Sequence, residues 1–66
     1  MSFGERIRQL RESKRLSLVE LANIARIPSR TLVMIESDIH FPRLHELERL
    51  LDALKVQYPD LQPLAE

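Results

Sequence analysis

The sequence contains no cysteine, and it has a single glycine among its 66 residues. Without cysteine, neither a disulfide framework nor a thiolate metal site can stabilise the fold, so we expect a reducing, cytoplasmic location. The single glycine excludes the glycine-rich loops that bind nucleotide phosphates. The longest apolar run, Leu32–Ile35, is far too short to cross a bilayer, and the N-terminus has no secretory pattern. These absences predict one small, soluble, intracellular domain.

The sequence also has no net charge, because ten basic side chains balance ten acidic ones. The two halves nevertheless differ. Residues 1–35 carry seven basic and three acidic side chains, and residues 36–66 carry three and seven, which gives +4 and −4. This split indicates one side that faces a polyanion and one acidic side, with an ordinary mixed surface as the alternative.

Leucine-rich composition and the absence of two-residue alternation predict an all-α fold of four or five helices. Two stretches of the form Ser-x-x-Glu, beginning at Ser2 and Ser17, match the capping box that opens a helix. The first of these helices should end near Arg15, whose charge suits the negative end of the helix dipole. The second should span about 18–25, because the residue before Pro28 is disfavoured in helical geometry.

The positions of proline and leucine predict two further helices and a tail. Pro28 suits the first turn of a third helix that ends near Ser37. Beyond a loop closed by Pro42, leucines recur at the spacing of a strongly amphipathic fourth helix, at positions 44, 47, 50, 51 and 54. We expect one domain over residues 1–56 and a C-terminal tail over residues 57–66 that forms at most a short helical turn.

The pattern of residues 18–37 predicts two short helices joined by a tight turn. In such an arrangement the second helix can enter the major groove of DNA. Ala22 supplies the small residue that the close crossing of two such helices requires. Four apolar residues are expected to fix the crossing: Leu21, Ile27, Leu32 and Ile35. Helix pairs of this kind also occur in ordinary bundles.

A more specific pattern extends over residues 4–56. Its stretches are Gly4-Glu5-Arg6-Ile7-Arg8, Leu10-Arg11-Glu12, Leu16-Ser17, Glu20-Leu21-Ala22, Ser29-Arg30-Thr31-Leu32, Ile35-Glu36, Pro42, and Leu50 to Leu54. Along this length and without a gap, the chain resembles the Cro/repressor-type (XRE) helix-turn-helix family. The resemblance implies a compact lambda-repressor-like domain whose third helix reads the major groove. It also implies an ion pair between Arg11 and Glu36 that locks this helix to the first one.

The resemblance further implies which residues contact double-stranded DNA. The base-reading positions are Ser29, Arg30, Val33 and Met34, and Arg30 suits guanine because a guanidinium can bond both O6 and N7. The phosphate-binding positions are Ser17, Leu18, Thr31, Ser37, His40 and Arg43. The expected state is a homodimer that pairs through the fourth helix and the tail residues Tyr58, Leu61 and Leu64, as a small transcriptional regulator.

Several positions depart from the family's pattern, and most of the replacements are apolar. Leu18 stands where a phosphate-binding glutamine is usual, and the loop after the third helix has Asp38 and large apolar groups in place of glycine and cations. These changes favour an alternative function, in which the helix-turn-helix fold serves as a protein-interaction module through a patch of Val33, Met34, Ile39 and Phe41. The alternative is that Ile39 and Phe41 fold back onto the fourth helix.

Two turns lack the glycine that the family favours, since Arg26 and Lys55 occupy them. Left-handed geometry at such residues costs about 1–2 kcal/mol each. Enzyme functions are not indicated, because the two histidines, His40 and His45, have neither zinc-protease nor catalytic-triad spacing. We therefore expect no catalytic residue, metal or cofactor, and no membrane partner.

Overall fold

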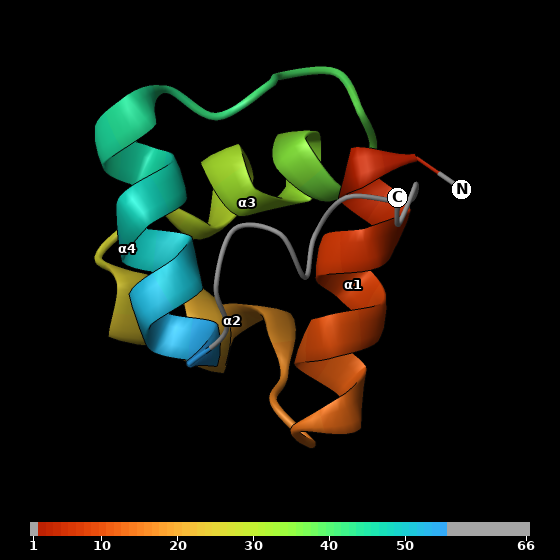
Figure 1. Cartoon of the computed structure of the whole chain (residues 1–66), viewed down its shortest axis with the longest axis vertical. Helices are drawn as coiled ribbons and strands as arrows, with labels where there is room; N and C mark the ends of the chain where they lie inside the picture. The colour runs from red at the N-terminus through yellow and green to blue at the C-terminus, as the bar shows by residue number, and fades with distance from the viewer. Residues whose placement is uncertain (1, 56–66) are drawn as a thin grey trace, which may run out of the picture.

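The computed structural model describes residues 2–55 of the chain. The tail predicted over residues 57–66 therefore lies outside the described residues. Residues 2–55 contain four helices and no strand, which confirms the all-α fold. The helices are α1 (Phe3–Ser13), α2 (Leu18–Ala25), α3 (Ser29–Glu36) and α4 (Leu44–Leu54). Figure 1 shows α1 and α4 on opposite sides of the molecule, with α3 between them.

Both predicted capping boxes are present. At the start of α1, the Ser2 hydroxyl accepts from the Glu5 amide and Glu5 Oε1 accepts from the Ser2 amide, each over 3.1 Å. At the start of α2, Ser17 and Glu20 form the same two bonds over 3.0 and 2.8 Å. These bonds satisfy amides that have no partner inside the helix, and for that reason α1 and α2 begin where the sequence predicts.

The end of α1 differs from the prediction by two residues. The helix ends at Ser13, and Arg15 adopts left-handed geometry with φ 58°. The Leu16 amide then bonds back to the Arg11 carbonyl over 3.2 Å, which is the closing bond of a Schellman motif. The favourable charge of Arg15 near the helix dipole therefore does not extend the helix.

Left-handed backbone occurs at four non-glycine residues among the described ones: Arg15, Arg26, Asp38 and Lys55. Arg26 and Lys55 follow the ends of α2 and α4, as predicted from the missing glycines. Arg15 and Asp38 were not predicted. Because each costs about 1–2 kcal/mol, the rest of the fold has to offset several kcal/mol of backbone strain.

The core forms where the faces of all four helices meet. Six side chains are fully buried: Ile7, Leu21, Leu32, Ile35, Leu50 and Leu54. Burial of each contributes roughly 1.5–3 kcal/mol. Ala22 is 1% exposed, as expected of a small residue at the crossing of α2 and α3, and Ile27 is also buried. The predicted apolar set around this crossing is thus confirmed.

Gly4 lies where the start of α1 meets the end of α3. A Cβ atom built on Gly4 would lie 2.5 Å from the carbonyl oxygens of both Ile35 and Glu36. Real Cβ atoms essentially never approach backbone this closely. The single glycine of the sequence therefore allows α1 and α3 to approach, a role that the sequence did not reveal.

Candidate nucleic-acid interface

The turn between α2 and α3 is short and tightly bonded. Arg26, in left-handed geometry with φ 60°, ends α2, and the Ile27 amide returns to the Ala22 carbonyl over 2.9 Å. Pro28 then precedes α3, where its fixed φ suits the entry to a helix. Two eight-residue helices joined in this way have the geometry of a helix-turn-helix.

The outer side of α3 carries the residues predicted to read bases. Ser29 and Arg30 are exposed, Val33 is 46% exposed and Met34 is half-buried. The opposite side of the helix is buried through Leu32, Ile35 and Glu36. The structure thus brings the four predicted base-reading residues onto one short helix, although Met34 presents less of its side chain than the other three.

An ion pair between Arg11 and Glu36 attaches α3 to α1. Arg11 Nε donates to Glu36 Oε2 over 2.8 Å, and the Nη2 atom donates to Glu36 Oε1 over 3.1 Å. The two side chains are 12% and 7% exposed. Arg11 Nη1 also donates to the Leu16 carbonyl over 3.0 Å, in the connection to α2. The hydrogen bond to Glu36 raises the pKa of Arg11 above its ordinary value.

The start of α2 offers backbone amides more than side chains. The Ser17 hydroxyl accepts from the Glu20 amide, and Leu18 is half-buried against the core. The amides of the first helical turn, at Leu18 and Val19, are those that an α-helix leaves without an internal partner, and such groups attract phosphate. The nearby carboxylate of Glu20 weakens this attraction, because it places a negative charge at the same end of α2.

The loop over residues 37–43 is attached to helices near both of its ends. Asp38 has φ 63°, and its Oδ1 accepts from the Gly4 amide over 2.9 Å. Hydrogen bonds from the Ser2 side chain and the Gly4 amide lower the pKa of Asp38. The structure thus joins the end of α3 to the start of α1 by a second polar contact.

At the other end of the loop, His40 Nε2 lies 3.0 Å from Glu46 Oε1, and the same oxygen accepts from the Arg43 amide over 2.9 Å. The Arg43 amide, and then the His40 ring, lower the pKa of Glu46. Of the predicted phosphate-binding residues in this region, Ser37 and Arg43 are exposed and Thr31 is half-buried. The His40 ring is engaged by Glu46.

The large apolar residues near this loop point outward. Ile39 is 74% exposed and Phe41 is 66% exposed, so neither folds back onto α4. The Phe41 ring instead lies against Phe3 at the start of α1, with 4.8 Å between the ring centroids. Leu44, assigned by its spacing to the apolar face of the fourth helix, is the first residue of α4 and is 71% exposed. The sequence therefore did not reveal the Phe3–Phe41 contact or the exposure of Leu44.

No helix within residues 2–55 has the length and apolar character needed to cross a membrane. Over the same residues, no group of three or more histidine or acidic side chains is arranged to hold a metal ion.

Comparisons with known proteins agree with this geometry. A family model described as a helix-turn-helix domain matches residues 2–64. The immunity repressor protein of Bacillus phage phi105 is 37% identical to this chain over 57 residues, which are 86% of the chain and 40% of the repressor. The chain thus spans well under half the length of that relative. No solved structure matches the chain significantly.

Proposed function

Since the chain belongs to the helix-turn-helix domain family, we propose that it binds double-stranded DNA sequence-specifically as a transcriptional regulator, with α3 in the major groove. The observation that carries the proposal is the buried attachment of α3 through Glu36, with Ser29 and Arg30 exposed on the other side of the helix. A relative named as an immunity repressor supports the regulatory role.

In this proposal, Arg30 selects guanine, since its guanidinium bonds O6 and N7 together. Val33 and Met34 contact thymine methyl groups, which apolar side chains are suited to read. Phosphates bind the amides at the start of α2 and the side chains of Ser17, Thr31, Ser37, His40 and Arg43. A homodimer would place two copies of α3 on half-sites one helical turn apart.

A fluorescence-anisotropy titration tests the proposal. The full chain is titrated with duplexes from the region upstream of its own gene and with random duplexes, at two salt concentrations. We expect preferential binding to one upstream duplex. We also expect weaker binding at the higher salt concentration, because phosphate contacts release counterions when they form. Binding no tighter than to random DNA at low salt contradicts the proposal.

Arg30→Ala should weaken binding to the preferred duplex by about 1–3 kcal/mol, roughly 5- to 150-fold, with much less effect on random DNA. The matched control is Arg8→Ala, which removes one exposed arginine from α1. An equal loss in both variants would mean that Arg30 contributes only its charge.

The exposed apolar residues favour a second candidate function, binding of a partner protein through the loop after α3. Ile39, Phe41 and Leu44, which are close in sequence, are each at least 66% exposed. Exposed apolar patches often mark interaction sites. Met34→Lys and Ile39→Lys would impair such binding. Under DNA binding, Arg30→Ala is the damaging change and Ile39→Lys is tolerated.

A further inference from the structure

His40 is attached to the end of α3 and to the start of α4. Its amide donates to the Met34 carbonyl of α3 over 3.2 Å, and the amide of Ile39 donates to the same carbonyl over 2.9 Å. Its ring reaches α4, where Nε2 lies 3.0 Å from Glu46 Oε1. The ring therefore has a fixed position relative to α3, the helix proposed to enter the major groove.

Glu46 determines which nitrogen of the His40 ring carries the proton. Hydrogen bonds from the Arg43 amide and from His40 lower the pKa of Glu46, so this carboxylate is ionised at neutral pH. An ionised carboxylate only accepts hydrogen bonds. The neutral ring therefore contacts Glu46 through an Nε2–H group, and its Nδ1 atom keeps a lone pair.

The Nδ1 atom of His40 is accessible from outside the protein. It has no hydrogen-bond partner among residues 2–55, and no buried side-chain nitrogen or oxygen of these residues is left without a partner. Nδ1 is therefore not buried, and the side chain as a whole is 30% exposed. The two nitrogens of an imidazole ring point in different directions, so contact with Glu46 leaves Nδ1 available to a ligand.

We propose that Glu46 orients His40 toward a DNA phosphate and that this contact requires a proton on Nδ1. On the neutral ring, Nδ1 and a phosphate oxygen are both acceptors and repel each other. A proton taken up from solvent makes Nδ1 a donor and places a positive ring between two anions, the carboxylate and the phosphate. Because histidine changes its charge between pH 5 and 8, affinity for DNA should rise as the pH falls through this range. The inference rests on the proposed function, since it concerns how the same surface binds DNA.

The other carboxylates on the elements around the loop have partners of their own. They are Glu36 of α3, bonded to Arg11, Asp38 of the loop, bonded to the Gly4 amide, and Glu5 of α1, bonded to the Ser2 amide. The cation Arg43 is exposed and shares Glu46 with His40 only through its backbone amide. Glu46 is therefore the carboxylate that acts on the ring.

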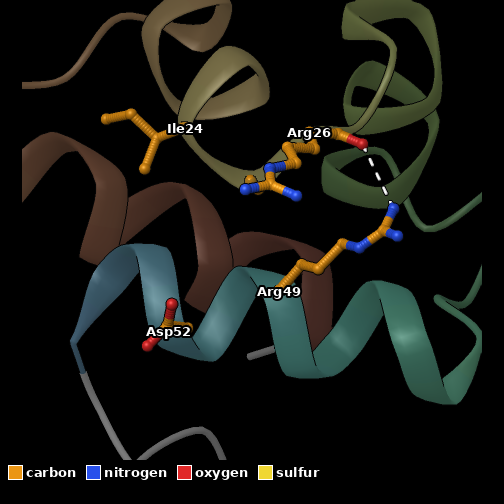
Figure 2. Close-up of a pocket in the computed structure, with 5 residues that line it drawn as sticks. Ile24, Arg26, Arg49 and Asp52 are labelled. Atoms are coloured by element: carbon orange, nitrogen blue, oxygen red, sulfur yellow. Dashed lines mark hydrogen bonds between the residues drawn. The ribbon is translucent and has the colours of Figure 1, made fainter.

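α4 also carries two basic side chains that separate this contact from general effects of charge. His45 is exposed and precedes Glu46 in the sequence, so it titrates in the same range of pH without contacting that carboxylate. Farther along α4, Arg49 Nη1 donates to the Arg26 carbonyl over 3.4 Å (Figure 2). Arginine keeps its charge at these pH values, so this contact does not respond to pH.

Fluorescence anisotropy of the full chain tests the proposal, with the preferred upstream duplex and with a random duplex at fixed ionic strength. Both duplexes serve, because phosphate contacts do not depend on sequence. We expect the affinity to rise about three- to tenfold from pH 8 to pH 6, as one charge-assisted hydrogen bond forms. In His40→Gln the rise should be less than about twofold, since an amide does not titrate. The matched control, His45→Gln, should keep the pH dependence of the original chain.

Glu46→Gln tests the positioning role. Its amide oxygen still accepts from the Arg43 amide and from Nε2, whereas the negative charge that favours the protonated ring is absent. We expect this variant to be folded by far-UV circular dichroism and to lose at least about half of the pH effect. If Glu46 only holds the loop in place, the pH profile should stay unchanged. Nitrogen NMR of the free chain at pH 8 adds a readout without DNA, and it should show the Nε2–H tautomer of His40.

Equal affinity at pH 8 and pH 6 overturns the inference. So does a pH effect that persists in His40→Gln or Glu46→Gln, or an Nδ1–H tautomer in the free chain. These results differ from a failure of the proposed function. A pH effect that depends on His40 on both duplexes, without preference for any upstream sequence, would refute sequence-specific regulation alone. A preference for one upstream duplex that is the same at both pH values would refute the role of His40 and Glu46 alone.

Discussion

Gly4→Ala tests whether the close approach of α1 to α3 determines the stability of this domain. The added methyl group would meet the carbonyl oxygens of Ile35 and Glu36 at 2.5 Å. Both atoms belong to the backbone, so no side-chain rotation relieves the contact, and one helix end has to move. The Gly4 amide would move with it, away from Asp38 Oδ1, now 2.9 Å distant.

Two opposing effects set the magnitude. Alanine in place of glycine inside a helix is favourable by roughly 0.5–1 kcal/mol. Overpacking against a rigid neighbour costs about 1–3 kcal/mol, and the cost belongs at the upper end here because two backbone atoms are met together. We expect the free energy of unfolding to fall by about 2 kcal/mol. This is a large fraction of the total free energy of unfolding, which is ~3–10 kcal/mol for a domain of this size.

Urea denaturation followed by circular dichroism at 222 nm measures this loss, since the chain has no tryptophan to report unfolding. Gln9→Ala, on the exposed side of α1, is the control and should change the free energy of unfolding by less than about 0.5 kcal/mol. A Gly4→Ala variant as stable as the original chain, or more so, would refute the reasoning. It would mean that helix propensity outweighs the contact with α3.

Three further changes follow from the polar contacts and the turns. Glu36→Ala should lower the free energy of unfolding, measured in urea, by roughly 3–5 kcal/mol, because it leaves the buried Arg11 unpaired. The control, Glu12→Ala, removes a carboxylate that is 62% exposed and should lower the free energy of unfolding by less than about 1 kcal/mol. Arg15→Gly should raise the free energy of unfolding by about 0.5–1 kcal/mol, because glycine adopts the left-handed backbone of this position without strain. A variant less stable than the original chain would contradict this explanation. The pKa values of Asp38 and Glu46 are lowered in the folded state, so both carboxylates stabilise the fold at pH values above their ordinary pKa values of 3.8 and 4.5. This stabilisation should be lost as the pH falls through the folded-state pKa values. Urea titrations from pH 7 to pH 2 should therefore show a shallower acid dependence in the double variant D38N/E46Q than in the original chain.

Features that depend on neighbouring residues were predictable from the sequence. The boxes at Ser2 and Ser17 need only a hydroxyl and a carboxylate three residues apart. Their positions, with Pro28 between α2 and α3, gave the order and nearly all the bounds of the helices. The missing glycine at Arg26 similarly predicted a left-handed turn, because the geometry of that turn is local.

Features that depend on tertiary contacts were not predictable. Gly4 has an ordinary place in the first turn of α1, and only the position of α3 explains why a side chain is excluded there. The same approach brings Asp38 to the Gly4 amide and Phe41 to Phe3, so the Phe41 ring lies against α1 and not against α4. Leu44 fits the helical period of its neighbours, yet the period alone does not show that the core ends before the first residue of α4.

The attachment of α3 to α1 has a consequence for local opening of the fold. α3 has eight residues and no side-chain cap at its start, so by itself it would be largely unfolded in water. Arg11 joins α3 to the connection that leads into α2, and its bonds to Glu36 break only when these segments separate. The amides of α3 and of the C-terminal half of α1 should therefore exchange with solvent deuterium as one cooperative unit, at a free energy close to that of global unfolding.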